Sequence, residues 1–300
     1  MGRVISLVNF KGGVGKTTLS VNLAAGIANR QNENRPYSVL VVDADPQGHA
    51  SAYMLGEKKY DPGQSLARAT ALWMDSKLEF LTEDFIVGNK FPNPVFDGSF
   101  PNLHLLPPGP DLREVEISGH VRLARMEANI AGRKYYKVIW YLCEKFFTES
   151  YDFIIIDCPP HYDWITAGLV LLSSDLIVPV IPDFLSTNGL KDLVLTITEE
   201  GQMLHRSPQI RALALMLWDE KNSVYSRFIS DLRSNAVKEC SSLSAASGRM
   251  MSSCEVWDGL HRRVDVQKRM QEFRPLVDSS GDSDSRIELE AMVDAILAWK

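Results

Sequence analysis

The feature that most constrains this 300-residue chain is a glycine-rich loop, Gly-Gly-Val-Gly-Lys-Thr-Thr, at residues 12–18. An apolar, β-branched run at residues 4–8 precedes the loop. Leu19, Leu23 and Ile27 follow it at the four-residue spacing that places side chains on one face of a helix. A strand that enters a short loop and leaves it as a helix predicts an α/β unit, in which helices cover a sheet.

The residue types in this loop are those that bind phosphate. Glycines let the backbone adopt unusual dihedral angles and approach an anion closely, and the amides of the loop and of the helix N-terminus then face that anion. Lys16 is expected to reach the β- and γ-phosphates, and the Thr17 hydroxyl to ligate Mg²⁺. The general pattern GxxxxGK[ST] has glycine where this chain has Phe10, but its GKT core is intact. The candidate nucleotide-binding residues here are Gly12, Gly13, Val14, Gly15, Lys16, Thr17 and Thr18.

Further apolar runs alternate with helix-length segments along the chain. Because these runs are almost wholly apolar, they are expected to be strands covered on both faces of a parallel sheet. The fold class predicted is α/β: a doubly wound, mostly parallel sheet with helices on both faces. The strands that follow the first are predicted at residues 38–42, 103–106, 153–156, 176–181 and 210–217.

One elaborated domain is expected to span residues 1–300. The interval 56–150 is long for a single crossover, and we interpret it as an elaboration of the same domain, with helices near residues 65–73 and 120–147. Serine-rich segments at 241–253 and 279–285 are predicted to be loops. The last helix is expected to dock on the core through a stripe formed by Leu289, Met292, Val293, Ile296 and Leu297.

Carboxylates end two of the predicted strands. Asp43 and Asp45 lie in VVDADPQG, and a pair at i, i+2 points to the same face of a strand. Asp157 ends the apolar strand of YDFIIIDCPP, at the strand end where α/β proteins place ligand groups. That position favours Asp157 as a residue that holds Mg²⁺ through water. For Asp43 and Asp45, the alternative interpretation is a turn, because Asp-Pro and Gln-Gly are good turn formers.

These motifs together resemble the ParA/MinD family of P-loop ATPases. NFKGGVGKTT is similar to the family's deviant Walker A motif, VVDADPQG to the DxDPQG motif of its ParA branch, and YDFIIIDCPP to its Walker B pattern. NLHLLPPGPDL at 102–112 resembles the family's strand and PxGxxL segment. The chain departs from the family at Leu169, near a place where an asparagine is common. The resemblance covers most of residues 3–190 and fades after about residue 200.

The resemblance implies an ATPase that uses ATP and Mg²⁺. Lys11 matches the signature lysine, which reaches the partner's nucleotide in an ATP-sandwich homodimer and there neutralises charge on the transferring phosphoryl group. By the same match, Asp45 positions or polarises the attacking water, Asp43 lies in the outer shell of Mg²⁺ and Gln47 helps to order the site. Pro182 is the family-based candidate for contact with adenine. The candidate catalytic residues are therefore Lys11, Lys16 and Asp45.

ParA-like relatives imply non-specific binding to duplex DNA in the ATP state, with slow hydrolysis stimulated by a partner protein of ParB type. The net charge of −6, from 32 basic and 38 acidic residues, argues against a constitutive nucleic-acid binder, so a local basic surface is required. Residues 201–275 carry 12 basic and 8 acidic side chains, whereas 276–300 carry 2 and 6. The alternative for the basic residues within 261–274 is that they form the solvated face of a helix. The candidate phosphate contacts are Arg262, Arg263, Lys268, Arg269 and Arg274.

Other functions of the same fold remain as alternatives. A MinD-like switch, or another positioning ATPase without DNA binding, is the second reading; the acidic last helix argues against a membrane-surface role. Four cysteines without CxxC spacing argue against an iron–sulfur protein, a zinc knuckle or a disulfide framework. The DPQG motif and Lys11 favour a hydrolysing switch over an amide-forming synthetase or a kinase, and the absence of NKxD disfavours a GTPase.

The expected location is the cytoplasm, with nucleoid association through DNA. No apolar run reaches the roughly 18–20 residues that cross a bilayer, and the N-terminus lacks the pattern of a secretory signal. The first strand begins by residue 3 or 4, so an upstream helix-turn-helix domain is not expected.

Overall fold

The computed structural model describes residues 2–56, 59–75, 77–88, 95–127, 135–182, 190, 192–199, 201, 208–218, 225, 228–230, 232–236, 254–261, 264–278 and 283–299. Its centre is a seven-stranded sheet in the order β5-β4-β6-β1-β7-β8-β9, in which all neighbouring pairs are parallel. The predicted doubly wound parallel fold is thereby confirmed. The strands are β1 (Arg3–Leu7), β4 (Val39–Asp43), β5 (Leu103–Leu106), β6 (Phe153–Asp157), β7 (Asp175–Val180), β8 (Gln209–Met216) and β9 (Glu255–Leu260).

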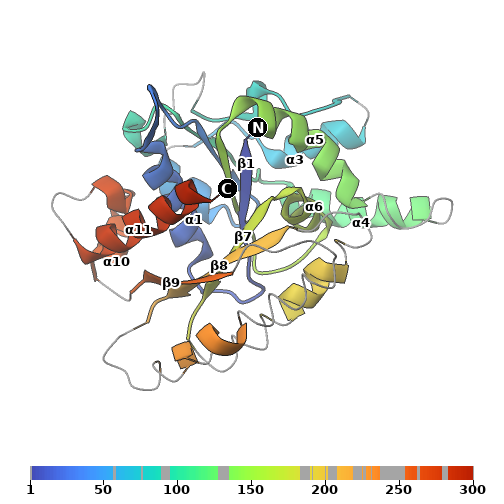
Figure 1. The fold of residues 1–300 in the computed structure, drawn as a ribbon. Coiled ribbons are helices and arrows are strands. Elements are labelled where there is room, and N and C mark those ends of the chain that lie inside the picture. Colours follow the sequence, from blue (N-terminus) through green and yellow to red (C-terminus); the bar gives the residue numbers. More distant parts are fainter. Residues whose placement is uncertain are drawn as a thin grey trace.

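Helices cover both faces of the sheet (Figure 1). One face carries α1 (Lys16–Ala28), α2 (His49–Leu55) and α11 (Asp284–Ala298), with α10 (Val264–Gln271) beside them. The other face carries α3 (Leu66–Met74), α4 (Leu112–Glu127), α5 (Tyr135–Ser150) and α6 (Trp164–Leu172). Among the smaller elements of the described chain are the hairpin β2 (Gln31–Asn32) and β3 (Arg35–Pro36) and the short helices η1 (Glu83–Phe85), η2 (Val95–Gly98), η3 (Leu232–Ala236) and η4 (Leu276–Asp278); residues 192–199 are helical as well.

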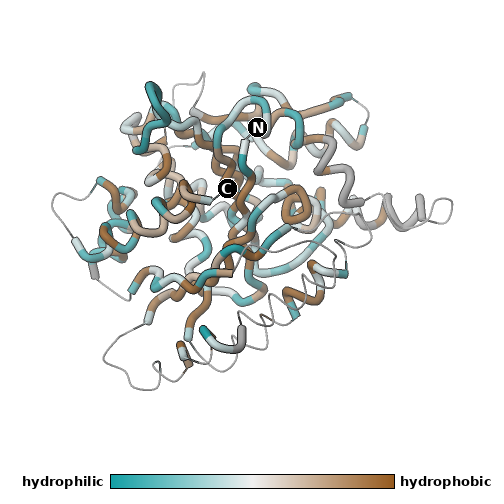
Figure 2. Tube along the Cα trace, viewed as in Figure 1, coloured by the Kyte–Doolittle hydropathy of each residue, from teal (hydrophilic) through white to brown (hydrophobic). Residues whose placement is uncertain are grey.

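The central strands contribute side chains to two hydrophobic cores, one on each face of the sheet. Successive side chains of a strand point to opposite faces, so Val4, Leu40 and Ile154 pack beneath α3, α5 and α6. Their neighbours Ile5 and Val41 pack beneath α1. Figure 2 shows the hydrophobic residues gathered along the strands and the inner sides of the helices. This double burial explains why the strands are apolar throughout instead of alternating.

The six predicted strands are all present, with ends within about one residue of the expected ones. The edge strand β9 was not predicted, because Glu255 and Asp258 interrupt its apolar pattern. Its extended conformation depends on parallel pairing with β8, which a local reading of the sequence does not detect.

The elaboration at 56–150 contains the expected helix near 65–73, which is α3, and the expected strand β5. Of the helical run predicted near 120–147, the structure describes α4, which begins earlier than expected at Leu112, up to Glu127, and α5 from Tyr135; residues 128–134 lie outside the described residues. Gly119 lies within α4, where a Cβ atom would stand 2.5 Å from the Trp164 ring of α6. This close approach positions α4 through tertiary packing, so its own polar, glycine-containing sequence predicts it poorly.

The last helix docks on the core, as predicted, through buried Leu289, Met292, Val293 and Ile296. A Cβ atom on Gly26 of α1 would lie 2.6 Å from Val293, which shows how closely α1 and α11 pack. The loop predicted at 279–285 is too long, because α11 begins at Asp284 and its N-cap Ser283 accepts the amide of Arg286. The predicted loop at 241–253 lies outside the described residues. In the part of the chain that the structure describes, no helix is long and apolar enough to cross a membrane.

Candidate nucleotide-binding site

The glycine loop connects the end of β1 to the start of α1, at the carboxyl edge of the sheet. Gly13 and Gly15 have φ angles of 74° and 88°, in the left-handed region that favours glycine. Lys16 is the first residue of α1, whose opening turn directs amide groups that lack partners within the helix toward the loop. The local sequence therefore builds the strand, glycine loop and helix N-terminus that the phosphate-binding prediction requires.

Lys16 is held inside this loop. Its Nζ donates hydrogen bonds to the carbonyl oxygens of Asn9, at 3.0 Å, and Lys11, at 3.1 Å. The side chain is largely buried, and burial lowers the pKa of its ammonium group. Asn9, which the sequence analysis did not single out, supports the start of the loop: its side chain donates to the carbonyl of Pro179 at 2.8 Å and accepts the Lys11 amide at 2.9 Å.

Two buried carboxylates lie side by side at the ends of neighbouring strands. Asp43 of β4 pairs in register with Asp157 of β6. The Thr17 hydroxyl donates to Asp157 Oδ2 at 2.7 Å, while Ser51 donates to Asp43 Oδ2 through its amide and its hydroxyl, both at 2.7 Å. The predicted metal-binding residues Thr17, Asp43 and Asp157 are thus brought together.

The pKa values of both carboxyl groups are raised, and binding of a cation between them would displace their protons to solvent. Burial, reinforced by the nearby charge of Asp43, raises the pKa of Asp157 to about 7. Burial raises the pKa of Asp43 to about 6, against the lowering effect of the Ser51 hydrogen bonds. Asp157 Oδ1 is buried without a hydrogen-bond partner among the described residues. Carboxylate and hydroxyl oxygens are the ligands Mg²⁺ prefers, so the residues present fit that ion.

Asp45 lies just beyond this pair, at the wall of a cavity. Its Oδ1 accepts the amide of Gln47 at 2.9 Å, and its own amide donates to Asp43 Oδ1 at 3.2 Å. The turn and the site are therefore one structure: the Asp-Pro-Gln-Gly turn orients Asp45 toward the cavity that the glycine loop also lines.

The cavity has a volume of about 1100 Å³ and extends from the glycine loop to the ends of β8 and β9. This is large enough for a nucleotide. Met216 packs against the loop, where a Cβ atom on Gly15 would lie 2.8 Å from it. The far wall, which β9, α10 and the residue after β8 form, is lined by Leu217, Leu260, His261, Val266, Gln267 and Met270. Pro182 is buried and is not among the residues that line this cavity in the described chain.

The residues of this far wall were not among those predicted from the sequence to form the site. Ligands of open α/β sheets bind outside the carboxyl ends of the strands, so the predicted end of β8 could have pointed to Met216 and Leu217. Leu260 and His261 gave no comparable signal, because β9 was not predicted.

The basic stretch lies beside the same cavity. Lys268 and Arg269 lie on α10, and Arg274 follows that helix. Lys268 lies 3.9 Å from Glu272, and Arg274 lies 3.8 Å from Asp278. Such exposed pairs contribute at most about 1 kcal/mol, so these cations remain available to other anions. Arg262 and Arg263 lie outside the described residues.

The raised pKa of Asp157 predicts a dependence of stability on pH. In the folded chain this carboxyl holds its proton up to about pH 7, whereas its ordinary pKa is 3.8. Its stabilising contribution is present below the ordinary pKa and is lost as pH rises through about 7. Asp157→Asn is therefore expected to stabilise the nucleotide-free protein at about pH 8 by on the order of 2 kcal/mol, with a smaller effect at about pH 5. Denaturant unfolding at both pH values measures this; an equal effect at both would contradict it.

Comparison with known proteins places the chain in a family. A family model described as an AAA domain matches residues 2–210. The chain is 28% identical over 238 residues to the chromosome partitioning protein ParA of Caulobacter vibrioides, covering 78% of this chain and 76% of that protein. It is 29% identical over 239 residues to the sporulation initiation inhibitor protein Soj of Bacillus subtilis, covering 78% and 79%.

Solved structures share the fold. An ATP complex of McdA from Cyanothece superposes with a TM-score of 0.70 at 16% identity, covering 100% of this chain and 97% of that one. The cell division ATPase MinD of Pyrococcus furiosus gives a TM-score of 0.61 at 20% identity, with 99% of each chain covered. Together with the site geometry, the sequence matches show that the chain belongs to the AAA-domain family that this model describes and, within it, to the ParA/MinD family of deviant Walker A P-loop ATPases.

Proposed function

We propose that this chain is a ParA-type switch: an ATPase that dimerises and binds duplex DNA non-specifically in the ATP state, and that acts in positioning a cargo. The observation that carries the proposal is the convergence of Lys16, Thr17 and Asp45 on one cavity, with buried Asp157 bound to the Thr17 hydroxyl. The ParA and Soj relatives support a role in partition or positioning.

In this proposal the loop from Gly12 to Thr18 holds the phosphates, and Lys16 exchanges its two carbonyl partners for phosphate oxygens. Thr17, Asp43 and Asp157 would hold Mg²⁺, with Asp43 in its outer shell and Asp157 acting through water. When bound there, the ion would supply positive charge against the phosphates. Asp45 orients the attacking water from the cavity wall, and Gln47 keeps the turn in place through its amide.

Lys11 is proposed to act on the nucleotide of a second copy. Its backbone is bound to Asn9, and it is not among the residues that line the cavity of its own chain, so far as the structure describes them. A cation in that position suits a role across an interface, where it would complete the partner's site and couple ATP binding to dimerisation. A partner protein of ParB type would then stimulate hydrolysis and release the DNA.

The alternative is a MinD-like or other positioning ATPase without DNA binding. The cobyrinic acid a,c-diamide synthase of Mycobacterium smegmatis, at a TM-score of 0.68 and 21% identity, shares the fold, so the fold alone does not separate a switch from a synthetase. Against a membrane-surface helix, the apolar side of α11 is already buried on the core. Cys143 and Cys158 are buried too, and burial raises the pKa of the Cys158 thiol to about 12, which suits packing more than cluster ligation.

The DNA proposal rests on α10. This helix contributes Val266, Gln267 and Met270 to the cavity wall, while Lys268 is exposed. A change of nucleotide in the cavity would therefore act directly on the helix that carries the basic residues. The net charge of −6 is compatible with DNA binding that requires two copies to assemble one basic surface.

We expect ATP-dependent, sequence-independent binding to duplex DNA that weakens steeply with salt. Combined Lys268→Ala and Arg274→Ala substitution should weaken binding to all sequences and lower the salt slope by roughly one unit per lost contact. Fluorescence anisotropy with ATP, ADP and no nucleotide measures this. Arg68→Ala is the matched control, because Arg68 is an exposed cation on α3, on the opposite face of the sheet. Absence of duplex binding at low salt with ATP and Mg²⁺ would favour the role without DNA.

A further inference from the structure

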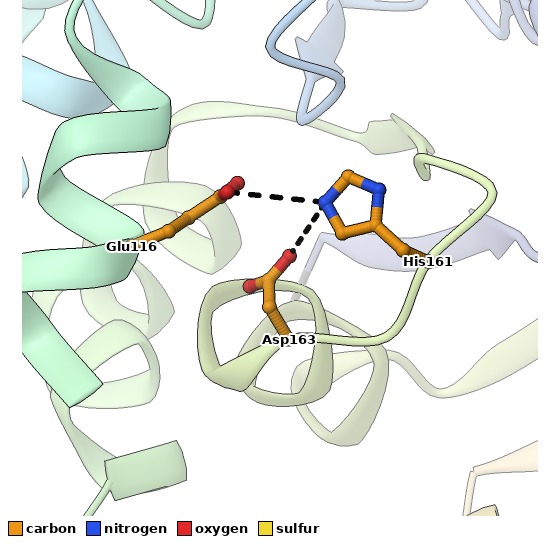
Figure 3. Close-up of side chains that lie close together, drawn as sticks. All are labelled: Glu116, His161 and Asp163. Atoms are coloured by element: carbon orange, nitrogen blue, oxygen red, sulfur yellow. Dashed lines mark ion pairs between the residues drawn. The ribbon is translucent and has the colours of Figure 1, made fainter.

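Three side chains outside the phosphate loop converge on one point (Figure 3). Glu116 comes from α4, while His161 and Asp163 come from the loop between β6 and α6. His161 Nε2 lies 3.3 Å from Asp163 Oδ2 and 3.8 Å from Glu116 Oε2. The potential ligand atoms of all three residues lie within 4.8 Å of one another.

The Glu116 carboxylate points into this cluster and is not satisfied by it. The residue is 6% exposed, and its Oε1 is a buried atom that lacks a hydrogen-bond partner in the described structure. Burial, together with the charge of Asp163, raises the pKa of this carboxyl to about 7. A buried carboxylate beside a second carboxylate is costly unless a cation compensates both.

The two helices hold the carboxylates in place. Asp163 is the N-cap of α6, and its Oδ1 accepts the amides of Ile165 and Thr166 at 2.7 and 3.0 Å. The Trp164 indole donates to the backbone carbonyl of Glu116 at 3.0 Å. The Trp164 bond ties α6 to α4, while Asp163 Oδ2 faces His161 and also accepts the Thr166 hydroxyl at 3.0 Å. The arrangement is supported by backbone contacts, as rigid ligand sites require.

The donor set selects the type of ion. One imidazole and two carboxylates suit a transition-metal ion such as Zn²⁺, whereas Mg²⁺ prefers oxygen ligands alone. Zinc bonds of about 2.1 Å in a tetrahedral site place neighbouring ligand atoms about 3.4 Å apart. The 3.3 Å from His161 Nε2 to Asp163 Oδ2 already matches this spacing, the 3.8 Å to Glu116 Oε2 needs a small closure, and all three ligand atoms lie within 4.8 Å of one another.

We propose that Glu116, His161 and Asp163 form a binding site for one Zn²⁺-class metal ion, with its fourth position taken by water. His161 and Arg113 also line the nucleotide cavity, so the metal would stand at the rim of that cavity. This site is separate from the Thr17, Asp43 and Asp157 group and does not depend on the proposed DNA or dimer function.

Equilibrium dialysis with Zn²⁺ tests the site, using the full chain in excess Mg²⁺ and ADP so that the phosphate site is filled. We expect one Zn²⁺ per chain, and visible absorption bands when Co²⁺ replaces it. His161→Ala and Glu116→Gln should each weaken binding at least about tenfold. Glu114→Gln and His49→Ala are matched controls, because both residues are exposed and lie outside the cluster; they should bind as wild type does.

Unfolding transitions and ADP binding, measured on every variant, separate loss of the site from loss of the fold. Two results would overturn the proposal. One is no stoichiometric Zn²⁺ binding to the wild-type chain. The other is binding that survives both His161→Ala and Glu116→Gln in folded protein, which would place the ion elsewhere and leave the cluster as an ion-paired contact between α4 and α6.

Discussion

Replacing Lys16 by alanine is expected to lower nucleotide affinity by at least about a hundredfold and to leave no measurable hydrolysis. Lys16 as a residue is 7% exposed, and its ammonium group donates hydrogen bonds to the carbonyls of Asn9 and Lys11, at the loop that would hold the phosphates. A charge-assisted contact of this kind is worth up to ~3 kcal/mol. Because burial lowers the Lys16 pKa, removing the ammonium should not destabilise the nucleotide-free fold.

Titration with a fluorescent ATP analogue in the presence of Mg²⁺ measures this effect, with thermal unfolding as the check on the fold. Lys11→Ala is the matched control. It removes a lysine from the same loop, but one that does not line the described cavity, so the single chain should bind nucleotide with nearly unchanged affinity. Wild-type affinity in a folded Lys16→Ala protein would show that the nucleotide lies elsewhere.

Replacing Asp45 by alanine should preserve ATP binding and reduce turnover by about 10²–10⁴-fold, the usual range for loss of an acid–base group. Asp45 lines the cavity, whereas Asp157 accepts the Thr17 hydroxyl and Asp43 accepts the amide and hydroxyl of Ser51. The different positions of these carboxylates therefore suit different roles. The buried pair, Asp43 and Asp157, suits metal binding, whereas Asp45 at the cavity wall suits contact with the attacking water. Single-turnover phosphate release, compared with equilibrium ATP binding, separates the two effects.

Asp45→Asn distinguishes chemistry from turn structure. The amide oxygen of asparagine can still accept the Gln47 amide that Asp45 Oδ1 accepts at 2.9 Å, while the charge is lost. Turnover by the asparagine variant should therefore be as slow as by the alanine variant. If Asp45→Asn hydrolysed ATP at the wild-type rate, Asp45 would be a turn residue and the assignment of the attacking water to it would be wrong.

Local chemistry determines the parts of the site that could be predicted from sequence. The glycine loop follows a strand that is buried on both faces, Lys16 and Thr17 open the helix after that loop, and Asp157 ends another such strand. Their order along the chain therefore already brings them to one sheet edge. The register of Asp43 with Asp157 follows from the parallel pairing of β4 and β6, which the spacing of the two strands indicates but does not specify.

The remaining parts depend on contacts between distant segments. β9 exists because it pairs with β8, and it brings Leu260 and His261 to the cavity. α4 depends on the fit of Gly119 against Trp164, and only that packing brings Glu116 to His161, 45 residues further along the chain. Periodicity and motif spacing contain no information about such pairs, and for this reason neither the far wall of the cavity nor the Glu116, His161 and Asp163 cluster was predicted.

If ATP assembles two copies of this chain, as the proposed function requires, the Asp45→Ala protein should form a dimer in solution when ATP is bound. Light scattering with ATP and Mg²⁺ should give twice the chain mass of 33.6 kDa, and the single-chain mass with ADP. Adding Lys11→Ala to that variant should restore the single-chain mass with ATP, because the partner's site would lose its cation. A single-chain mass for Asp45→Ala at saturating ATP would contradict the claim.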